Sequence, residues 1–262
     1  MPDDRDTLFD LDAVSFRIGE RVVLEPLTLA LAQGRIHGLV GPNGSGKSTL
    51  VKILARQQAA TSGTVRLFGR SLPEFTDRAF SRLVAYMPQF TPPTDSLTVK
   101  ELVSLGRFPW HGALGRFGDE DAAKVDEALG QTDLHSFPGR MVDSLSGSER
   151  QRVWLAMMLA QDTRCLLLDE PTSALDVAHQ VEILSLVREL GRERGMGVVV
   201  VLHDINMAAR YCDEIIALRD GRMVARGTQA QILDGAVLGR IYGMPLGILH
   251  HPVTGAPISY VP

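Results

Sequence analysis

Cysteine is scarce in this chain, with only Cys165 and Cys212 among its 262 residues. Cys165 opens an apolar run and Cys212 lies in a segment with a helical pattern. We therefore expect two reduced, partly buried thiols rather than a disulfide. A chain of this length buries a sizeable core, so folding needs no covalent cross-link.

Long hydrophobic runs and a strong excess of one charge are absent as well. The longest aliphatic runs, 165–168 and 198–202, are far shorter than the roughly 20 apolar residues of a membrane-spanning helix. The acidic start of the chain lacks the apolar stretch of a secretory signal. Lys and Arg total 27 against 31 Asp and Glu, a net charge of −4. We expect a chain that does not cross a membrane by itself and that binds no nucleic acid.

The chain does contain a series of apolar segments separated by turn residues. Alternation over 11–16, an apolar run over 22–31 and turns at 19–20 and 33–34 predict short strands with breaks in the first forty residues. The tail after residue 227 is predicted to be helical and irregular. Further strands are predicted at 36–40, 63–69, 83–87, 164–168, 197–202 and within 213–227, and helices from Ser48, over most of 119–161 and over 178–194.

Two of these strands carry a clear topological signal. Residues 164–168 and 197–202 are almost wholly apolar, which suits strands buried on both faces of a parallel sheet. The helical pattern over 178–194 joins them, so the three segments form a right-handed strand–helix–strand unit. The sequence therefore predicts an α/β fold with a mostly parallel sheet.

A glycine-rich loop follows the strand 36–40 and precedes the helix that starts near Ser48. Its sequence, G-P-N-G-S-G-K-S, matches G-x-x-x-x-G-K-[ST] without a mismatch. Such a loop turns backbone N–H groups inward around a polyphosphate, and the helix adds the positive end of its dipole. The lysine supplies a charge to the outer phosphates and the serine hydroxyl a ligand for Mg²⁺. The nucleotide-binding residues predicted here are Gly41, Pro42, Asn43, Gly44, Ser45, Gly46, Lys47, Ser48 and Thr49.

A pair of carboxylates ends the apolar strand 164–168. Burial of a carboxylate at a strand end is costly unless the group has a task. In a phosphate-loop fold, Asp169 holds Mg²⁺ directly or through water, and Glu170 orients or polarises an attacking water. These two motifs alone leave kinases, GTPases and several ATPase classes open.

Three further features narrow the choice. Leu145-Ser-Gly-Ser-Glu149 opens a helical stretch, Gln89 follows the strand 83–87, and His203 follows the strand 197–202. Together with the two motifs above, this order over residues 36–204 resembles the nucleotide-binding subunit of ATP-binding cassette (ABC) transporters.

The resemblance implies a role for each matching residue. Glu170 is the expected general base, His203 contacts the γ-phosphate and orients that base, and Gln89 senses Mg²⁺ and the attacking water. The residues expected to bind Mg²⁺ are Ser48, Gln89 and Asp169. Ser146, Gly147 and Ser148 face the γ-phosphate of ATP held by the opposite subunit, and Asp176 helps to form the subunit interface or serves as a helix N-cap.

The sequence departs from the family pattern at two positions. The second glycine usual in the signature is replaced by Ser148, whose hydroxyl either crowds the γ-phosphate or adds a hydrogen bond to it. The family often stacks an aromatic residue on adenine, and by spacing Ile18 occupies that place. Phe16 is the alternative, but it lies further off.

The resemblance also implies an architecture and partners. We expect a RecA-like phosphate-loop core with an N-terminal antiparallel β subdomain and an inserted helical subdomain at 90–161. The single ATPase domain spans 8–262, after a disordered or extended segment 1–7. The implied ligands are ATP and Mg²⁺. The implied partners are a second copy of the chain, transmembrane permease subunits and, indirectly, a periplasmic siderophore-binding protein, at the cytoplasmic face of a bacterial inner membrane.

The cargo follows from likeness alone. Segments 106–118, 160–179, 203–213 and 243–252 resemble the ATPase subunit of iron(III)-hydroxamate siderophore importers, and the first is where the family contacts its membrane subunit. Importers of haem, cobalamin or other siderophores are the near alternatives. A soluble ABC ATPase without transport, a nucleotide-dependent scaffold with poor hydrolysis and a small-molecule kinase are the alternatives from other classes.

Overall fold

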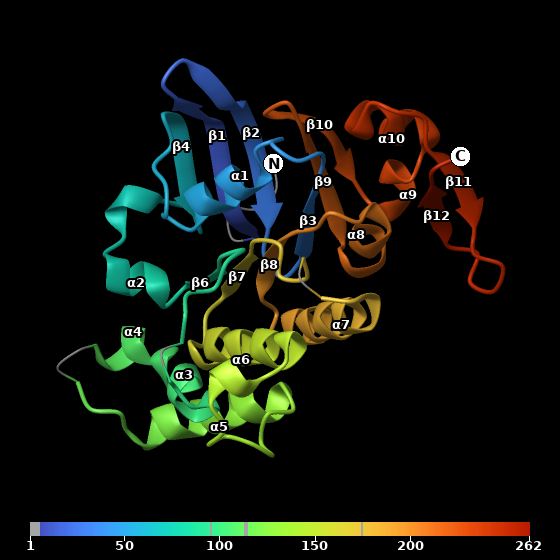
Figure 1. Cartoon of the computed structure of the whole chain (residues 1–262). Helices are drawn as coiled ribbons and strands as arrows, with labels where there is room; N and C mark the ends of the chain where they lie inside the picture. The colour runs from blue at the N-terminus through green and yellow to red at the C-terminus, as the bar shows by residue number, and fades with distance from the viewer. Residues whose placement is uncertain (1–5, 95, 113–114, 174) are drawn as a thin grey trace.

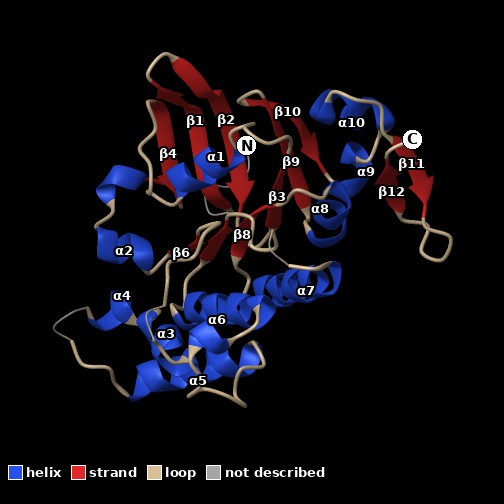
Figure 2. Cartoon of the chain, in the orientation of Figure 1, coloured by secondary structure: helices blue, strands red, loops and turns tan. Residues whose placement is uncertain are grey.

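The computed structural model describes residues 6–262 except 95, 113–114 and 174. Three sheets and the helices around them make up the chain (Figures 1 and 2). A six-stranded sheet has the order β10-β9-β3-β8-β7-β6, and an N-terminal antiparallel sheet has the order β2-β1-β4-β5. The expected α/β class with an antiparallel N-terminal sheet is therefore confirmed. The strands are β1 Thr7–Ile18, β2 Arg21–Ala32, β3 Ile36–Val40, β4 Ser62–Leu67, β5 Arg70–Ser71, β6 Val84–Met87, β7 Cys165–Leu168, β8 Gly197–Val201, β9 Glu214–Arg219, β10 Arg222–Gly227, β11 Gly247–His250 and β12 Pro257–Tyr260.

The helices lie on both sides of the six-stranded sheet. The phosphate-loop helix α1 fills the space between this sheet and the N-terminal sheet (Figure 2). Helices α3 to α6 belong to the segment 90–161 and form a group below β6 and β7 in Figure 1. The helices are α1 Lys47–Leu54, η1 Leu72–Glu74, α2 Asp77–Ser81, α3 Val99–Leu105, α4 Phe108–His111, α5 Asp119–Gln131, η2 Val142–Ser144, α6 Gly147–Ala160, α7 Val177–Glu193, α8 Ile205–Tyr211, α9 Gln229–Ile232 and α10 Gly235–Tyr242.

The central strands are buried on both faces, as their apolar sequences predict. Along β8, Val198 and Val200 belong to the core shared with α6 and α7, while Val199 and Val201 belong to the core shared with α1. Successive side chains of a strand point to opposite faces, so a strand between two cores must be apolar at every position. The parallel pairings β3–β8, β8–β7 and β7–β6 place the carboxyl ends of four adjacent strands at one edge.

Two parts of the fold differ from the sequence-based expectation. The first forty residues form two strands of 12 residues each rather than several short ones. Pro26 does not interrupt β2 because β2 is an edge strand, where a missing N–H is tolerated. The predicted irregular tail contains the hairpin β11–β12, whose glycines and prolines hid the strands. Of the predicted N-terminal segment 1–7, residues 1–5 lie outside the described residues.

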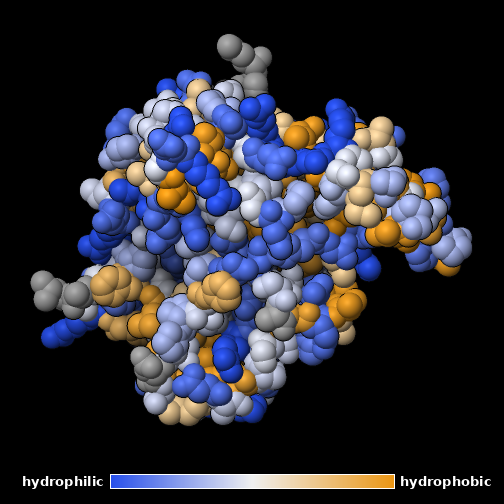
Figure 3. All heavy atoms as spheres, turned by 45° about the horizontal axis from the view of Figure 1, so that its top comes forward, coloured by the Kyte–Doolittle hydropathy of each residue, from blue (hydrophilic) through white to orange (hydrophobic). Residues whose placement is uncertain are grey.

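Asn206 of α8 holds the C-terminal hairpin. Its side chain accepts from the Ser259 N–H at 2.8 Å and donates to the Ser259 carbonyl at 3.1 Å, as a neighbouring strand would. Several apolar side chains of the segment after α10 remain on the surface, at the right in Figure 3. They are Met244, Leu249, Val253, Tyr260 and Val261.

Both cysteines are free, with Cys165 buried and Cys212 partly buried, as expected. Burial raises the pKa of the Cys212 thiol to about 12, so it stays protonated at neutral pH. Among the described residues, no helix combines the length and the apolar character that spanning a bilayer requires.

A partly buried, hydrogen-bonded cluster ties β3 to β9. Nδ1 of the fully buried His37 lies 3.0 Å from Oε2 of Glu214. Arg226 donates to both carboxylate oxygens of Glu214, at 2.8 and 3.1 Å. The bond from His37, then those from Arg226, lower the pKa of Glu214 to about 2 from 4.5, against the opposing effect of burial.

We predict that Glu214 stabilises the fold at neutral pH and that this contribution is lost in acid. A lowered folded-state pKa gives stability that is complete above pH 4.5 and is lost as the pH falls towards 2. Glu214→Gln should lower the free energy of unfolding at pH 7 by about 2–3 kcal/mol. Urea titrations followed by circular dichroism measure the change. An unchanged decline of stability between pH 4.5 and 2 in this variant, with exposed Glu20→Gln as control, would contradict the assignment.

Candidate active site

The phosphate loop joins β3 to α1 through three glycines, and Gly41 and Gly46 are held at positions where a side chain would be strained or would clash. Gly41 has φ 137°, and a Cβ atom there would lie 1.9 Å from the Leu218 carbonyl oxygen. Gly46 has φ 99° and forms the N-cap of α1, leaving the first N–H groups of the helix directed into the loop. The backbone of this loop is therefore shaped for an anion before any ligand binds.

Lys47 lies inside the loop rather than in solvent. Its ammonium group donates to the carbonyl oxygens of Gly41 and Pro42, each at 2.9 Å. Burial lowers the pKa of Lys47, while the charges of Glu170 and Asp169 oppose that shift. Because this cation is held next to the loop N–H groups, it can transfer its hydrogen bonds to a phosphate with little movement.

Ser48 and Asp169 meet at the first turn of α1. The Ser48 hydroxyl donates to Oδ1 of Asp169 at 2.8 Å, while Oδ2 is buried without a partner. Asp169 is only 1% exposed, and this desolvation raises the pKa of its carboxyl group. A hydroxyl oxygen beside an unsatisfied carboxylate oxygen is a donor set that fits Mg²⁺ and its water ligands.

Glu170 occupies the junction between three strand ends. Its Oε2 atom accepts from Nε2 of Gln89 at 2.6 Å and lies 2.7 Å from Nε2 of His203. Glu170 has φ 55°, a left-handed conformation that costs energy for a residue with a side chain. This conformation turns the carboxylate toward both neighbours, so the structure brings together the three residues that the sequence selects as catalytic.

A cavity of about 320 Å³ opens over the phosphate loop. Ile18 lines it and is 64% exposed, whereas Phe16, two residues earlier, packs inside the core. Ile18 is thus the apolar surface beside the loop. Arg21 and Val23 also line the cavity, and neither was predicted from the sequence. The tight turn at 19–20 pairs Arg21 with Ile18, so it is a sequence signal that could have indicated Arg21. The other lining residues are Asn43, Gly44, Ser45, Gly46, Lys47, Ser48, Thr49 and Glu170.

The signature residues lie at the start of α6. Ser146 is the N-cap of this helix and, with Glu149, forms a capping box. The Ser148 hydroxyl lies 3.3 Å from that of Ser146. Neither serine nor Gly147 is among the described residues that line the phosphate-loop cavity. One copy of the chain therefore does not bring its own signature to its own phosphate loop.

Asp176 acts as a helix cap in this structure. It is the N-cap of α7 and accepts from the His179 N–H at 3.0 Å and from its ring at 2.8 Å. These bonds lower the pKa of Asp176, with the backbone bond from His179 as the largest cause. Ala174, two residues before Asp176, lies outside the described residues.

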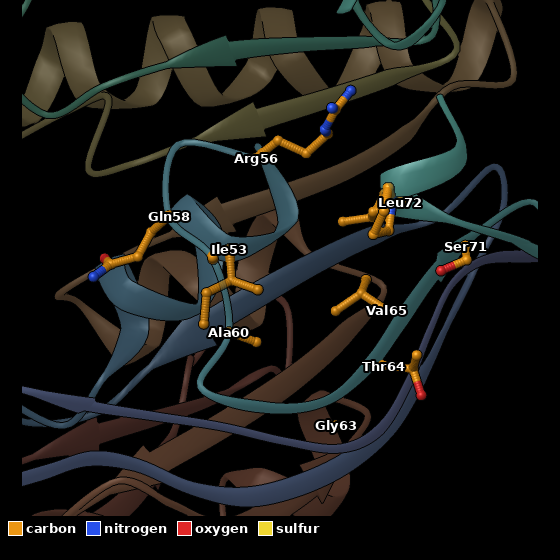
Figure 4. Close-up of a pocket in the computed structure, with 11 residues that line it drawn as sticks. Ile53, Arg56, Gln58, Ala60, Gly63, Thr64, Val65, Ser71 and Leu72 are labelled. Carbon is orange, nitrogen blue, oxygen red and sulfur yellow. The ribbon is translucent and has the colours of Figure 1, made fainter. Parts of the chain in front are cut away.

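A second hollow, of about 350 Å³, lies at the opposite end of α1 (Figure 4). The side chains of Ile53, Val65 and Leu72 form its apolar wall. Arg56, on its rim, is already paired with Asp77 at 3.2 Å. The C-terminal end of a helix presents carbonyl oxygens rather than N–H groups, so the two ends of α1 differ in chemistry and its N-terminal end is the one that suits a polyphosphate.

The fold and the site define a phosphate-loop nucleoside triphosphatase with a carboxylate beside the phosphate-binding loop. A family model of ABC transporters matches residues 24–173. The chain belongs to the ABC transporter family and is an ATP-binding, ATP-hydrolysing subunit of the kind found there.

Curated relatives are similar over almost the whole chain. The achromobactin transport ATP-binding protein CbrD of Dickeya dadantii is 42% identical over 91% of this chain and 88% of its own length. The iron(3+)-hydroxamate import ATP-binding protein FhuC of Bacillus subtilis is 40% identical over 92% of this chain and 89% of its own length. The hemin import ATP-binding protein HmuV of Rhodococcus jostii is 42% identical over 94% and 84%.

Solved structures share the fold. The ABC transporter cassette MJ1267 in its ADP conformation superposes with a TM-score of 0.80 at 20% identity, covering 89% of this chain and 98% of its own. The cassette MJ0796, solved as a dimer in a post-hydrolysis state with ADP and phosphate, has a TM-score of 0.72 at 31% identity, covering 85% and 99%.

We predict that Lys47→Ala weakens ATP binding by about 10- to 100-fold, since a hydrogen bond to a charged group contributes about 1.5–3 kcal/mol. Titration with a fluorescent ATP analogue measures the affinity. Lys100→Ala on α3 removes the same charge at an exposed position outside the cavity and serves as control. Equal affinity of the Lys47 variant and the parent would refute the role of Lys47.

Proposed function

We propose that this chain is the motor subunit of a bacterial ABC importer for iron(III)-hydroxamate siderophores. The contact of Glu170 with Gln89 and His203, beside a preformed phosphate loop, is the observation that carries the motor role. Similarity to proteins named for achromobactin, iron(3+)-hydroxamate and hemin supports an iron-related cargo. The sequence identities between this chain and these three relatives differ little, so importers of haem, cobalamin or another siderophore are the alternatives.

Two copies would act as a head-to-tail pair. ATP would lie between Gly41–Ser48 of one copy and Ser146 and Gly147 of the other, with Asp176 at the interface. The separation of the signature from the phosphate-loop cavity within one chain supports this arrangement. Ser148 would add its hydroxyl beside the γ-phosphate. Binding of ATP closes the pair, because ligand charges form much of the interface, and hydrolysis reopens it.

The proposed catalytic roles are based on the hydrogen bonds around the phosphate loop and Glu170. Lys47 would exchange its two loop carbonyls for phosphate oxygens. Ser48, Asp169 and Gln89 would hold Mg²⁺, which neutralises developing phosphate charge when bound. Gln89 would bind the metal through its amide oxygen, the atom that its bond to Glu170 leaves free, and the Glu170 carboxylate would accept the proton of the attacking water. His203 keeps the carboxylate oriented and reaches the γ-phosphate.

The helical segment 90–161 would carry this motion to permease subunits in the membrane. Its surface exposes Phe90, Leu105, Phe108 and Phe117, and aromatic side chains are common in the cores of protein interfaces. Within the predicted contact segment 106–118, Arg107 is buried instead and pairs with Asp121 at 2.8 Å, so it serves the packing of this subdomain. Residues 113–114 of that segment lie outside the described residues.

A direct link joins this segment to the nucleotide-binding core. Arg78 and Arg82 of the α2 region donate to the carbonyl oxygens of Pro109 and Trp110 in α4. The Arg82 guanidinium also lies 4.7 Å from the centre of the Trp110 ring. β6 lies between Arg82 and Gln89 in the chain, so a movement of this strand would reach the proposed docking surface through the bonds of Arg82.

We predict that Glu170→Gln lowers the turnover of ATP at least 100-fold while ATP binding persists, because the amide cannot accept the proton. The variant should accumulate as an ATP-bound dimer, measurable by size-exclusion chromatography with light scattering. Glu182→Gln, an isosteric change on the exposed part of α7, is the control. Turnover at the parental rate would show that another group is the base.

The transport role is tested with the membrane partner. The chain should copurify with permease subunits and drive ATP-dependent uptake of iron(III)-hydroxamates into vesicles. Uptake of haem or cobalamin with no uptake of hydroxamates would overturn the cargo and keep the motor role. ATP hydrolysis without any permease partner would instead favour a soluble ABC ATPase.

A further inference from the structure

Three buried polar atoms in or beside the phosphate loop have no hydrogen-bond partner among the described residues. One is the Ser45 hydroxyl oxygen of the loop itself, and the other two are the hydroxyl oxygen of Tyr86 on β6 and Oδ2 of Asp169, just beyond β7. Buried polar groups are normally satisfied by protein atoms or by ordered water. Two unsatisfied atoms from adjacent strands therefore point to a shared partner.

The sheet places these two side chains on the same face. β6 and β7 are parallel neighbours in which Tyr86 pairs with Leu167, so Asp169 follows two residues beyond that pair. Tyr86 and Leu167 both pack in the core that contains α1, and Asp169 faces α1 through its bond to Ser48. Strand spacing and rise set the Cα atoms of Tyr86 and Asp169 about 8 Å apart, a span that a tyrosine ring and one water can fill.

We propose that Tyr86 is a positioning residue for Asp169, with its hydroxyl donating to Oδ2 through one buried water. A buried water typically bridges groups that lack other partners. The two groups also sense each other electrostatically: burial first, and then the charge of Asp169, raise the pKa of Tyr86 to about 12. The phenol thus remains a hydrogen-bond donor throughout the physiological range. Lys52, one turn after Ser48, is a further charge that favours ionised Asp169.

The bridge would act when the nucleotide binds, and in this respect it rests on the proposed function. Oδ1 of Asp169 is held by the Ser48 hydroxyl. That hydroxyl would bind Mg²⁺ through its oxygen and could still donate its proton to Oδ1, so Oδ2 is the carboxylate oxygen that lacks a hydrogen bond from the described residues. The contact from Tyr86 to Oδ2 then keeps the carboxylate aimed at the metal site, as outer-sphere hydrogen bonds do for metal-binding carboxylates.

Tyr86→Phe tests this role by removing a single oxygen atom. The Mg²⁺ concentration that half-saturates ATP binding should rise about 10-fold, the lower end of the cost of such outer-sphere losses. ATP binding in the presence of a chelator should not change, because the phosphate loop is intact. Tyr242→Phe is the matched control, since Tyr242 also has a buried, unpartnered hydroxyl with a pKa raised to about 12.

A high-resolution crystal structure of the metal-free parent provides an independent readout. Density for one water between the Tyr86 hydroxyl and Oδ2 of Asp169 is the expected result, and its loss in Tyr86→Phe would support the bridge. An unshifted Mg²⁺ dependence in Tyr86→Phe, or a Tyr86 hydroxyl bonded elsewhere, overturns the inference. Absence of ATP hydrolysis in the parent chain would instead count against the proposed function, since Mg²⁺-dependent binding is measured separately.

Discussion

One constraint organises the whole molecule: the parallel alignment of four adjacent strands, β3, β8, β7 and β6. Parallel strands end at a common edge, so every group placed just beyond a strand meets the others there. The phosphate loop follows β3, His203 follows β8, Asp169 and Glu170 follow β7, and Gln89 follows β6. Residues 162 positions apart in the sequence, from Gly41 to His203, thus become parts of one site without a long functional loop.

The same constraint explains why the core must be so apolar. A site built at the ends of buried strands needs those strands fixed on both faces, and the alternation of β8 between two cores provides this. The energy gained there offsets costs at the edge, where Asp169 is desolvated and Glu170 adopts a left-handed backbone. Strain and burial at this edge are tolerated because the surrounding packing determines the backbone so completely.

The sequence predicted the parts of this design that depend on local pattern. Apolar runs gave the central strands, and glycine spacing gave the phosphate loop, because these signals come from residues close together in the chain. The length of β1 and β2 and the hairpin β11–β12 were missed, since edge pairing tolerates Pro26 and glycine or proline conceals short strands. Contacts between segments, such as Arg21 beside Ile18 or Gln89 on Glu170, depend on side-chain placement that one sequence does not specify.

The hydrogen bonds at the site also indicate which contacts would change during the proposed hydrolysis. Oε2 of Glu170 accepts from Gln89 and lies against His203, Lys47 is bonded to its own loop, and Ser48 is bonded to Asp169. The bonds of Lys47 to its own loop must exchange for phosphate oxygens in the proposed hydrolysis, whereas the contacts of Glu170 with His203 and of Ser48 with Asp169 can persist. The amide of Gln89 occupies the carboxylate oxygen of Glu170 that lies against His203, so a shift of Gln89 would make that oxygen more accessible to water. Because Gln89 lies just before the segment that leads to α3 and α4, the same shift would reach the proposed docking surface and would couple hydrolysis to transport in the proposed importer.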